Sequence, residues 1–175
     1  MDSARLSARE RQPGHDRTFI TSENSFIEVA RACLDPEVYE VVDHPRELAG
    51  LFPGVNGDRD LGVVPEAAII NKHTEKRLFV EVKKQGDQGN ADERACKHHT
   101  VQFYKCLHDR FGYDYHPFVT VMCESLATNP RYTRKAVYPF EPDQYFLWKN
   151  YEPDLLCKYL RERCGEWLDD PEGSS

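Results

Sequence analysis

Apolar and polar residues recur along the chain with two periods, one typical of helices and one typical of strands. Residues 22–34 carry apolar side chains every three or four positions behind a group of capping residues, which predicts a helix. Residues 61–72 and 77–84 are rich in aliphatic side chains, and the polar stretch 73–76 between them predicts the turn of an antiparallel hairpin. Pro65 inside the first of these strands indicates an edge or a bulge.

The rest of the chain adds two helices and one strand to this pattern. Residues 35–60 are interrupted by prolines and glycines and predict mostly loop, with room for one short helix. Residues 91–112 predict one long helix, 116–125 a buried strand and 153–168 an amphipathic C-terminal helix. Helices and strands in this order predict an α/β fold with a mixed central sheet flanked by helices.

Length and composition are those of one folded domain. The chain has 175 residues, of which 39% are apolar and 30% charged, enough for a core of its own. We therefore expect one domain over residues 21–168, between flexible tails at 1–20 and 169–175. The N-terminus lacks the apolar stretch of a secretory signal, no apolar run is long enough to cross a membrane, and the six cysteines are scattered. These features predict a cytoplasmic protein with reduced cysteines and no membrane partner.

The distribution of charge leaves the class of partner open. The formal net charge is −7, which by itself disfavours nucleic acid. Residues 72–105, however, contain eight Lys or Arg and five Asp or Glu, so this segment is positive and the rest of the chain carries the negative charge. A positive patch on an acidic protein is compatible with DNA binding, but charge alone does not decide the function.

The predicted hairpin brings acidic and basic side chains to one place. Glu81 and Lys83 are two positions apart in the second strand, so they share one face of it. Glu66 lies on the first strand, close enough to share a cation with Glu81. Magnesium prefers hard oxygen ligands and usually takes one or two protein carboxylates. Taken alone, a Glu-x-Lys strand is also compatible with an ordinary exposed ion pair.

Two motifs in this region are similar to those of a known family. Pro65-Glu66, fourteen intervening residues and Glu81-Val82-Lys83 resemble the catalytic motif of the PD-(D/E)xK nucleases. The following run, Gly89-Asn90-Ala91-Asp92-Glu93-Arg94, resembles the Gly-Asn-Ala-x-Glu-Arg turn of the EcoRI/MunI-like group of type II restriction endonucleases. The resemblance implies a restriction-endonuclease-like fold and a magnesium-dependent homodimer that hydrolyses double-stranded DNA to 5′-phosphates. It also implies a palindromic site with an AATT core and no small-molecule cofactor besides the metal.

The resemblance assigns roles to the residues of both motifs. Glu66 and Glu81 are expected to bind Mg²⁺, and Lys83 to assist the attacking water. The turn from Asn90 to Arg94, including Ala91, Asp92 and Glu93, is expected to read bases, with the Asn90 amide on an adenine. Gln85 follows the lysine as in several relatives and is expected to lie beside the metal or DNA. Lys84, Lys97 and Lys105 are candidates for phosphate contacts, with ordinary solvated lysines as the other interpretation. His98 and His99 are candidates for a phosphate contact, although exposed helix histidines need no function.

Several assignments stay open on the sequence alone. The family usually has Asp where this chain has Glu66, and Asp60 is an alternative ligand six residues upstream. Glu28 on the first predicted helix is a candidate accessory carboxylate, with a surface glutamate as the other interpretation. The rival functions are a DNA-binding module that kept the fold but lost the chemistry, and a repair or processing nuclease with the same core.

Overall fold

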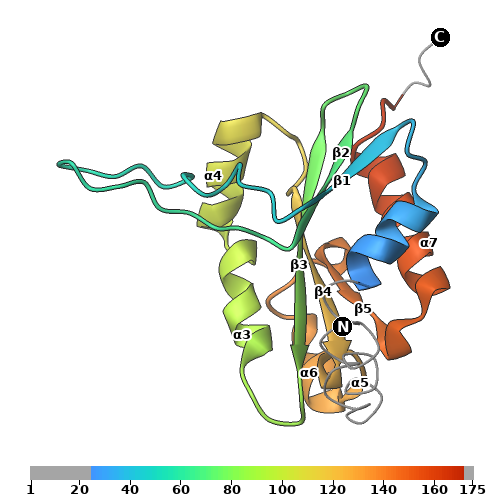
Figure 1. The fold of residues 1–175 in the computed structure, drawn as a ribbon. Coiled ribbons are helices and arrows are strands. Elements are labelled where there is room, and N and C mark those ends of the chain that lie inside the picture. Colours follow the sequence, from blue (N-terminus) through green and yellow to red (C-terminus); the bar gives the residue numbers. More distant parts are fainter. Residues whose placement is uncertain (1–24, 172–175) are drawn as a thin grey trace, which may run out of the picture.

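The computed structural model describes residues 25–171, which form a five-stranded sheet with helices on both faces (Figure 1). The first helix spans residues 25–33. The other elements, in chain order, are β1 Tyr39–Asp43, β2 Ala67–Asn71, β3 Arg77–Gln85, α3 Ala91–Ala95, η1 Cys96–His99, α4 Val101–Phe111, β4 Phe118–Glu124, α5 Ser125–Thr128, α6 Pro130–Ala136, η2 Pro142–Gln144, β5 Tyr145–Leu147, η3 Lys149–Tyr151 and α7 Pro153–Trp167. The predicted N-terminal tail at 1–20 lies outside the described residues. Within the described range no helix is long and apolar enough to span a membrane.

The central sheet is mixed, as the sequence predicts. Its strands lie in the order β1-β2-β3-β4-β5, with antiparallel pairing from β1 to β3 and parallel pairing from β3 to β5. The pairing of β2 with β3 confirms the predicted hairpin and sets Ala67 opposite Val80. Because β3 and β4 are parallel, with Glu81 opposite Thr120, their C-terminal ends lie at the same end of the sheet.

Each face of the sheet is covered by different helices. On one face, Val80 of β3 packs in a cluster with Phe26 of the first helix and Leu160 of α7. On the opposite face, Phe79 packs in a cluster with Phe103 of α4. Each fully buried side chain of this size contributes about 1.5–3 kcal/mol. The two clusters therefore fix β3 from both sides.

The predicted helix over residues 91–112 is wrong in one respect, because it is not continuous. α3 and η1 end at His99, and Thr100 has an extended backbone, with φ −82° and ψ 155°. The Thr100 hydroxyl accepts a hydrogen bond from the backbone N–H of Phe103 at 3.1 Å, so it caps a new helix, α4. α4 then ends at Gly112, whose left-handed backbone (φ 72°) suits glycine. The apolar spacing continues across the break, which is why it predicted one helix.

Residues 35–60 are mostly loop, as predicted, but they also contain the strand β1, which the sequence analysis did not identify. β1 pairs with β2 at the edge of the sheet, with Tyr39 opposite Asn71. Within β1 only Val41 is buried, while Glu40 and Asp43 are exposed. One buried position in five is too weak an alternation to identify a strand from the sequence.

A projecting arm, residues 51–62, replaces the first half of the strand predicted at 61–72. β2 begins only at Ala67, and Leu61 lies instead in the return limb of the arm, which extends away from the sheet (Figure 1). An isolated bridge joins Phe52 to Leu61 across the two limbs. Pro65 is buried just before β2 rather than within it.

The C-terminal helix α7 confirms the prediction for residues 153–168. The structure also shows contacts one residue beyond that range. Asp169 accepts hydrogen bonds from the Tyr39 hydroxyl and from the Asn71 amide, the second at 2.9 Å. Ordered contacts therefore reach one residue past the predicted domain end at 168.

Candidate active site

β3 carries the candidate catalytic side chains on one face. Side chains alternate along a strand, so Glu81, Lys83 and Gln85 share the face that α3 and α4 cover, opposite Val80 and Val82. Lys83 Nζ lies 2.5 Å from Glu81 Oε1, and the two side chains are 24% and 11% exposed. This largely buried ion pair differs from the solvated pair that an isolated Glu-x-Lys strand usually makes.

Glu66 meets this ion pair from the neighbouring strand. It directly precedes β2, and because Ala67 is opposite Val80, Glu66 falls beside Glu81. The backbone N–H of Val82 donates to Glu66 Oε2 at 3.1 Å, and a hydrogen bond joins the carboxyl groups of Glu66 and Glu81. The structure thus brings together the two predicted metal ligands and, through Glu81, the predicted catalytic lysine.

Burial and proximity change the protonation of the two carboxyl groups. Burial, together with the hydrogen bond to Glu81 and its negative charge, raises the pKa of Glu66 to about 8. Burial also opposes ionisation of Glu81, but hydrogen bonds from Glu66 and Lys83 outweigh it and lower the pKa of Glu81. At neutral pH the pair therefore holds one proton, on Glu66, and one negative charge, beside Lys83.

This pair has the donor chemistry of a site for a hard divalent cation. Two carboxylates forced to share a proton offer hard oxygen ligands, and a cation in place of the proton would remove their repulsion. Among residues 25–171 no group of three or more His, Cys, Asp or Glu side chains is arranged to hold a metal ion. A cation at Glu66 and Glu81 would therefore take its other ligands from water or substrate oxygens, as Mg²⁺ commonly does.

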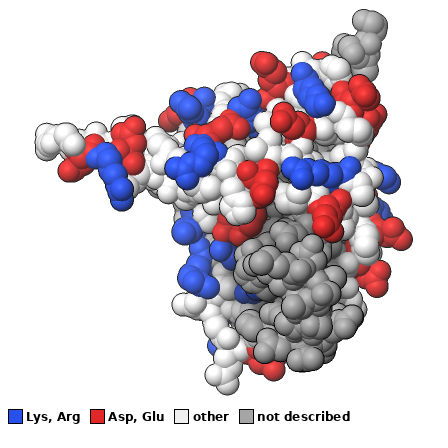
Figure 2. All heavy atoms as spheres, viewed as in Figure 1, with Lys and Arg blue, Asp and Glu red and all other residues white. Residues whose placement is uncertain are grey.

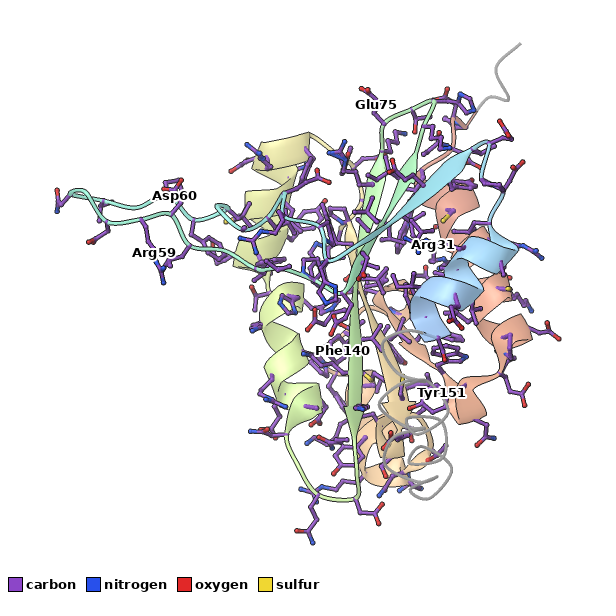
Figure 3. The ribbon with its side chains drawn as sticks, in the orientation of Figure 1. Arg31, Arg59, Asp60, Glu75, Phe140 and Tyr151 are labelled. Atoms are coloured by element: carbon purple, nitrogen blue, oxygen red, sulfur yellow. The ribbon has the colours of Figure 1, made fainter. Side chains whose placement is uncertain are left out.

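Two other carboxylates considered as ligands lie elsewhere. Asp60 is exposed on the arm, where its Oδ1 accepts a hydrogen bond from the backbone N–H of Gly54 at 2.9 Å (Figure 3). Glu28 is exposed on the first helix, which packs on the face of the sheet opposite Glu81. The structure does not bring either side chain to Glu66 and Glu81, so the accessory role of Glu28 stays a prediction without structural support.

The turn after β3 presents Asn90 and Arg94 to solvent. Asn90 is the N-cap residue of α3, yet its side chain makes no capping hydrogen bond. Arg94 is exposed one helical turn further on, and its backbone N–H donates to the Asn90 carbonyl at 3.0 Å. Figure 2 shows Lys and Arg side chains gathered over α3, below the arm. A free amide and a guanidinium this close together on a positive surface suit contacts to base edges and phosphates.

The residues between them point partly into the protein. Ala91 and Asp92 are buried, and Asp92 Oδ2 lies 3.3 Å from Lys135 Nζ on α6. Glu93 is exposed and lies 3.5 Å from the same ammonium group. Ala91 and Asp92 therefore hold α3 against α6, and their contact with DNA stays a prediction.

The lysines predicted to contact phosphate differ in their placement. Lys97 and Lys105 are exposed on the side of the sheet that carries Glu81. Lys84 is half-buried and, by strand alternation, points to the face opposite Lys83. A phosphate bound at Glu81 and Lys83 would therefore not meet Lys84 on that face.

His98 and His99 are not the exposed helix histidines that the sequence suggests. His98 is 3% exposed and stacks on Phe118, with ring centroids 4.4 Å apart. His99 Nε2 lies 2.8 Å from the hydroxyl of Thr120, the β4 residue beside Glu81. Burial lowers the pKa of His98 to about 4 and that of His99 to about 3. A neutral imidazole packed against the sheet suits a phosphate poorly, so the structure lends no support to the phosphate contact considered for these two residues.

The sequence alone did not identify the side chains that hold the turn between β3 and α3. Asp87 Oδ1 accepts a hydrogen bond from Ser125 at 2.9 Å, and the Asp87 carbonyl accepts one from the Tyr132 hydroxyl at 2.9 Å. These partners lie 38 and 45 residues away in the sequence. No local pattern marks them, because the parallel pairing of β3 with β4 is what brings them together.

Comparison with known families decides the class of protein. The family model described as type II restriction enzyme MunI matches residues 1–169, which include every residue of the candidate site. The chain belongs to the MunI family of type II restriction enzymes. A MunI-family chain is a restriction endonuclease, so Glu66, Glu81 and Lys83 lie in an enzyme rather than in a binding module.

Two relatives show how far the similarity to MunI extends. The type II restriction enzyme MunI of Mycoplasma sp is 25% identical over 180 residues, covering 85% of this chain and 89% of that protein. The crystal structure of MunI restriction endonuclease in complex with cognate DNA is 26% identical, with a TM-score of 0.65, and the match covers 75% of this chain and 83% of that one. The structural match confirms the predicted restriction-endonuclease-like fold.

Proposed function

We propose that this MunI-family enzyme hydrolyses double-stranded DNA at a palindrome with an AATT core, using Mg²⁺ and leaving 5′-phosphates. The observation that carries the proposal is the largely buried cluster of Glu66, Glu81 and Lys83 on and beside β3, the strand that leads into the turn exposing Asn90. The catalytic residues and the base-reading residues would then lie at the same end of β3. The MunI structure in complex with cognate DNA supports double-stranded DNA as the substrate.

The chain's own residues would divide the hydrolysis between them. Glu66 and Glu81 would hold the Mg²⁺, which when bound polarises the scissile phosphate and lowers the pKa of a water ligand. Lys83, whose Nζ lies 2.5 Å from Glu81 Oε1, would orient the attacking water or offset the charge that develops on the phosphate. Water would attack the phosphorus directly, without a covalent enzyme intermediate.

The AATT core rests on the turn. Adenine presents an N7 acceptor beside an N6 donor in the major groove, and an asparagine amide pairs with both. Asn90 has such an amide, uncommitted to capping α3, in a turn that resembles the one shared by the EcoRI/MunI-like group. The residues that would read the flanking base pairs lie outside this turn, so the proposal covers the four central base pairs.

Each chain carries one candidate site, and one site cuts one strand. Cutting both strands of a palindrome therefore calls for two chains related by a two-fold axis. We propose a homodimer for this reason. Sedimentation of the purified protein at micromolar concentration should give the mass of two chains, and the mass of one chain with and without DNA would contradict the dimer.

Digestion of a sequenced plasmid tests the proposal. With Mg²⁺ the wild-type protein should give discrete fragments whose ends place AATT at the centre of the site, and EDTA should stop the reaction. Fragment ends without AATT would contradict the proposed core of the site but not the nuclease activity. A smear of fragments would indicate a processing nuclease, and a gel shift without cleavage would indicate a binding protein; either result would contradict the proposal.

A further inference from the structure

Gln85 links the catalytic strand to the turn that follows it. It is the last residue of β3, and its side chain is on the same face as Glu81 and Lys83. Its Oε1 accepts a hydrogen bond from the backbone N–H of Ala91 at 2.7 Å. Ala91 is the first residue of α3, so the end of the strand directly holds the start of the helix.

The backbone of the turn leaves room for this contact. Gly89 has φ +148°, a conformation that other residues rarely adopt. A Cβ atom on Gly89 would lie 2.9 Å from Gln85 Oε1, closer than such atoms approach one another. A glycine is therefore needed at position 89 for two reasons. It allows the backbone to bend, and it leaves space for the Gln85 side chain to reach the backbone N–H of Ala91.

A second set of hydrogen bonds holds the middle of the same turn. Asp87 accepts from Ser125 and Tyr132, each at 2.9 Å. Ser125 reaches Asp87 because the chain turns sharply at Glu124, which ends β4 with φ +55°. Glu124 is paired with Gln85 across the two parallel strands. The turn is thus held at Asp87 from α5 and α6, and at Ala91 from β3.

The chemistry of Gln85 indicates more than packing. Its Nε2 is buried and has no hydrogen-bond partner among the described residues. An apolar side chain of similar size would fill the same space without leaving a buried donor unsatisfied. What an apolar side chain cannot do is accept the Ala91 hydrogen bond.

We propose that Gln85 is a positioning residue that sets the position of the base-reading turn (Asn90 to Arg94) relative to Glu81 and Lys83. It does not touch the reacting atoms. Because Gln85 fixes Ala91 relative to Glu81 and Lys83, the scissile phosphate is placed correctly only when Asn90 is paired with its base. The inference rests on the proposed function and adds to it the element that transmits recognition to chemistry.

The test compares Gln85→Met with Gln85→Glu. Methionine keeps the length of the side chain but cannot accept the Ala91 hydrogen bond well, whereas glutamate keeps the acceptor. Cleavage rates are measured on a duplex with the preferred site and on one with a single altered core base pair. We expect Gln85→Met to lower kcat on the preferred site, and its preference over the altered site, by about tenfold or more. Gln85→Glu should recover most of the preference.

Controls separate positioning from general destabilisation. Gln102→Met makes the same change at an exposed position of α4 and should cleave both duplexes as the wild type does. Hydrogen–deuterium exchange of residues 86–95 should speed up in Gln85→Met, while β3 stays protected. Ser125→Ala, which removes one of the hydrogen bonds to Asp87, should change the preference in the same direction.

Two results would overturn the inference. One is a Gln85→Met enzyme that keeps the wild-type preference; the other is an equal loss on both duplexes that Gln85→Glu does not restore, which would mark Gln85 as merely structural. A wild-type protein that cuts no DNA would instead overturn the proposed function and the inference with it. The wild-type digest therefore distinguishes the two failures before any variant is measured.

Discussion

Replacing Glu66 with glutamine should stabilise the metal-free protein at alkaline pH while abolishing cleavage. The Glu66 carboxyl accepts a hydrogen bond from Val82 at 3.1 Å and shares another with Glu81. Glutamine can keep both, because its amide oxygen accepts and its NH₂ group donates to the Glu81 carboxylate. It has no proton to lose, so a second negative charge never appears beside Glu81.

The raised pKa of Glu66 sets the sign and size of this effect. A pKa that rises from 4.5 to about 8 on folding means that the native state holds this proton more tightly than the unfolded state. The resulting stabilisation is complete below about pH 4.5 and is lost as the pH rises through 8. At about 1.4 kcal/mol per pKa unit, the wild type should lose on the order of 3–5 kcal/mol of unfolding free energy that Glu66→Gln does not lose.

Urea denaturation in EDTA at roughly pH 5 and pH 9, followed by tryptophan fluorescence, measures this difference. Glu40→Gln, at an exposed position of β1, is the matched control and should follow the wild type. Adding Mg²⁺ at the higher pH should stabilise the wild type far more than Glu66→Gln, because a ligand stabilises the state that binds it. An unfolding free-energy difference between wild type and Glu66→Gln that is equal at both pH values would refute the shared-proton reasoning.

Other changes test the site, the ligand set, the base reading and the buried histidines. Glu81→Ala and Lys83→Ala should each abolish plasmid cleavage while the gel shift persists, since phosphate contacts elsewhere supply most of the affinity; parental cutting rates would contradict the assignment. Asp60→Ala should cut at the parental rate because Asp60 lies on the arm, and an inactive variant would indicate that Asp60 is a metal ligand. Asn90→Ala should lose about 1–3 kcal/mol of discrimination between matched and altered duplexes, with non-specific binding unchanged; full discrimination would exclude Asn90 as the reader. Because burial lowers the pKa of His99 from 6.5 to about 3, metal-free wild type should lose stability as the pH falls below about 6.5. Urea titrations of His99→Gln should show a weaker loss, and an identical pH profile would mean that another group titrates.

Local signals were sufficient for the part of the fold that carries the site. The hairpin of β2 and β3 needs only two apolar strands and a short polar turn, all within 20 residues of one another. Strand alternation then places Glu81 and Lys83 on one face. The carboxylate pair was predictable for the same reason, since Glu66 directly precedes β2 and Glu81 lies on β3, and the turn between these strands sets their register.

The rest of the fold could not be predicted in the same way. It depends on local patterns that fit two structures equally well, or on contacts between residues far apart in the sequence. The break between η1 and α4 depends on whether the Thr100 hydroxyl caps a helix or lies within one, and the apolar spacing is the same in both cases. β1 is an edge strand with one buried residue, and the burial of His98 follows from its packing against Phe118 of β4 and Phe103 of α4 rather than from its neighbours in sequence. Lys135 is 43 positions from Asp92, so their ion pair becomes visible only when the fold brings α6 to α3.

The shortness of the connection from β3 to α3 limits how an enzyme of this design changes its target in evolution. Six residues separate Lys83 from Asn90, and the backbone that displays the amide is continuous with the backbone that aligns the ammonium group. A mutation that shifts the turn to suit a new base therefore also shifts the chemistry, and selection for activity removes it. New targets are accordingly expected to arise by changes at the flanking base pairs, where readers lie on other segments, while the central preference is inherited with the strand.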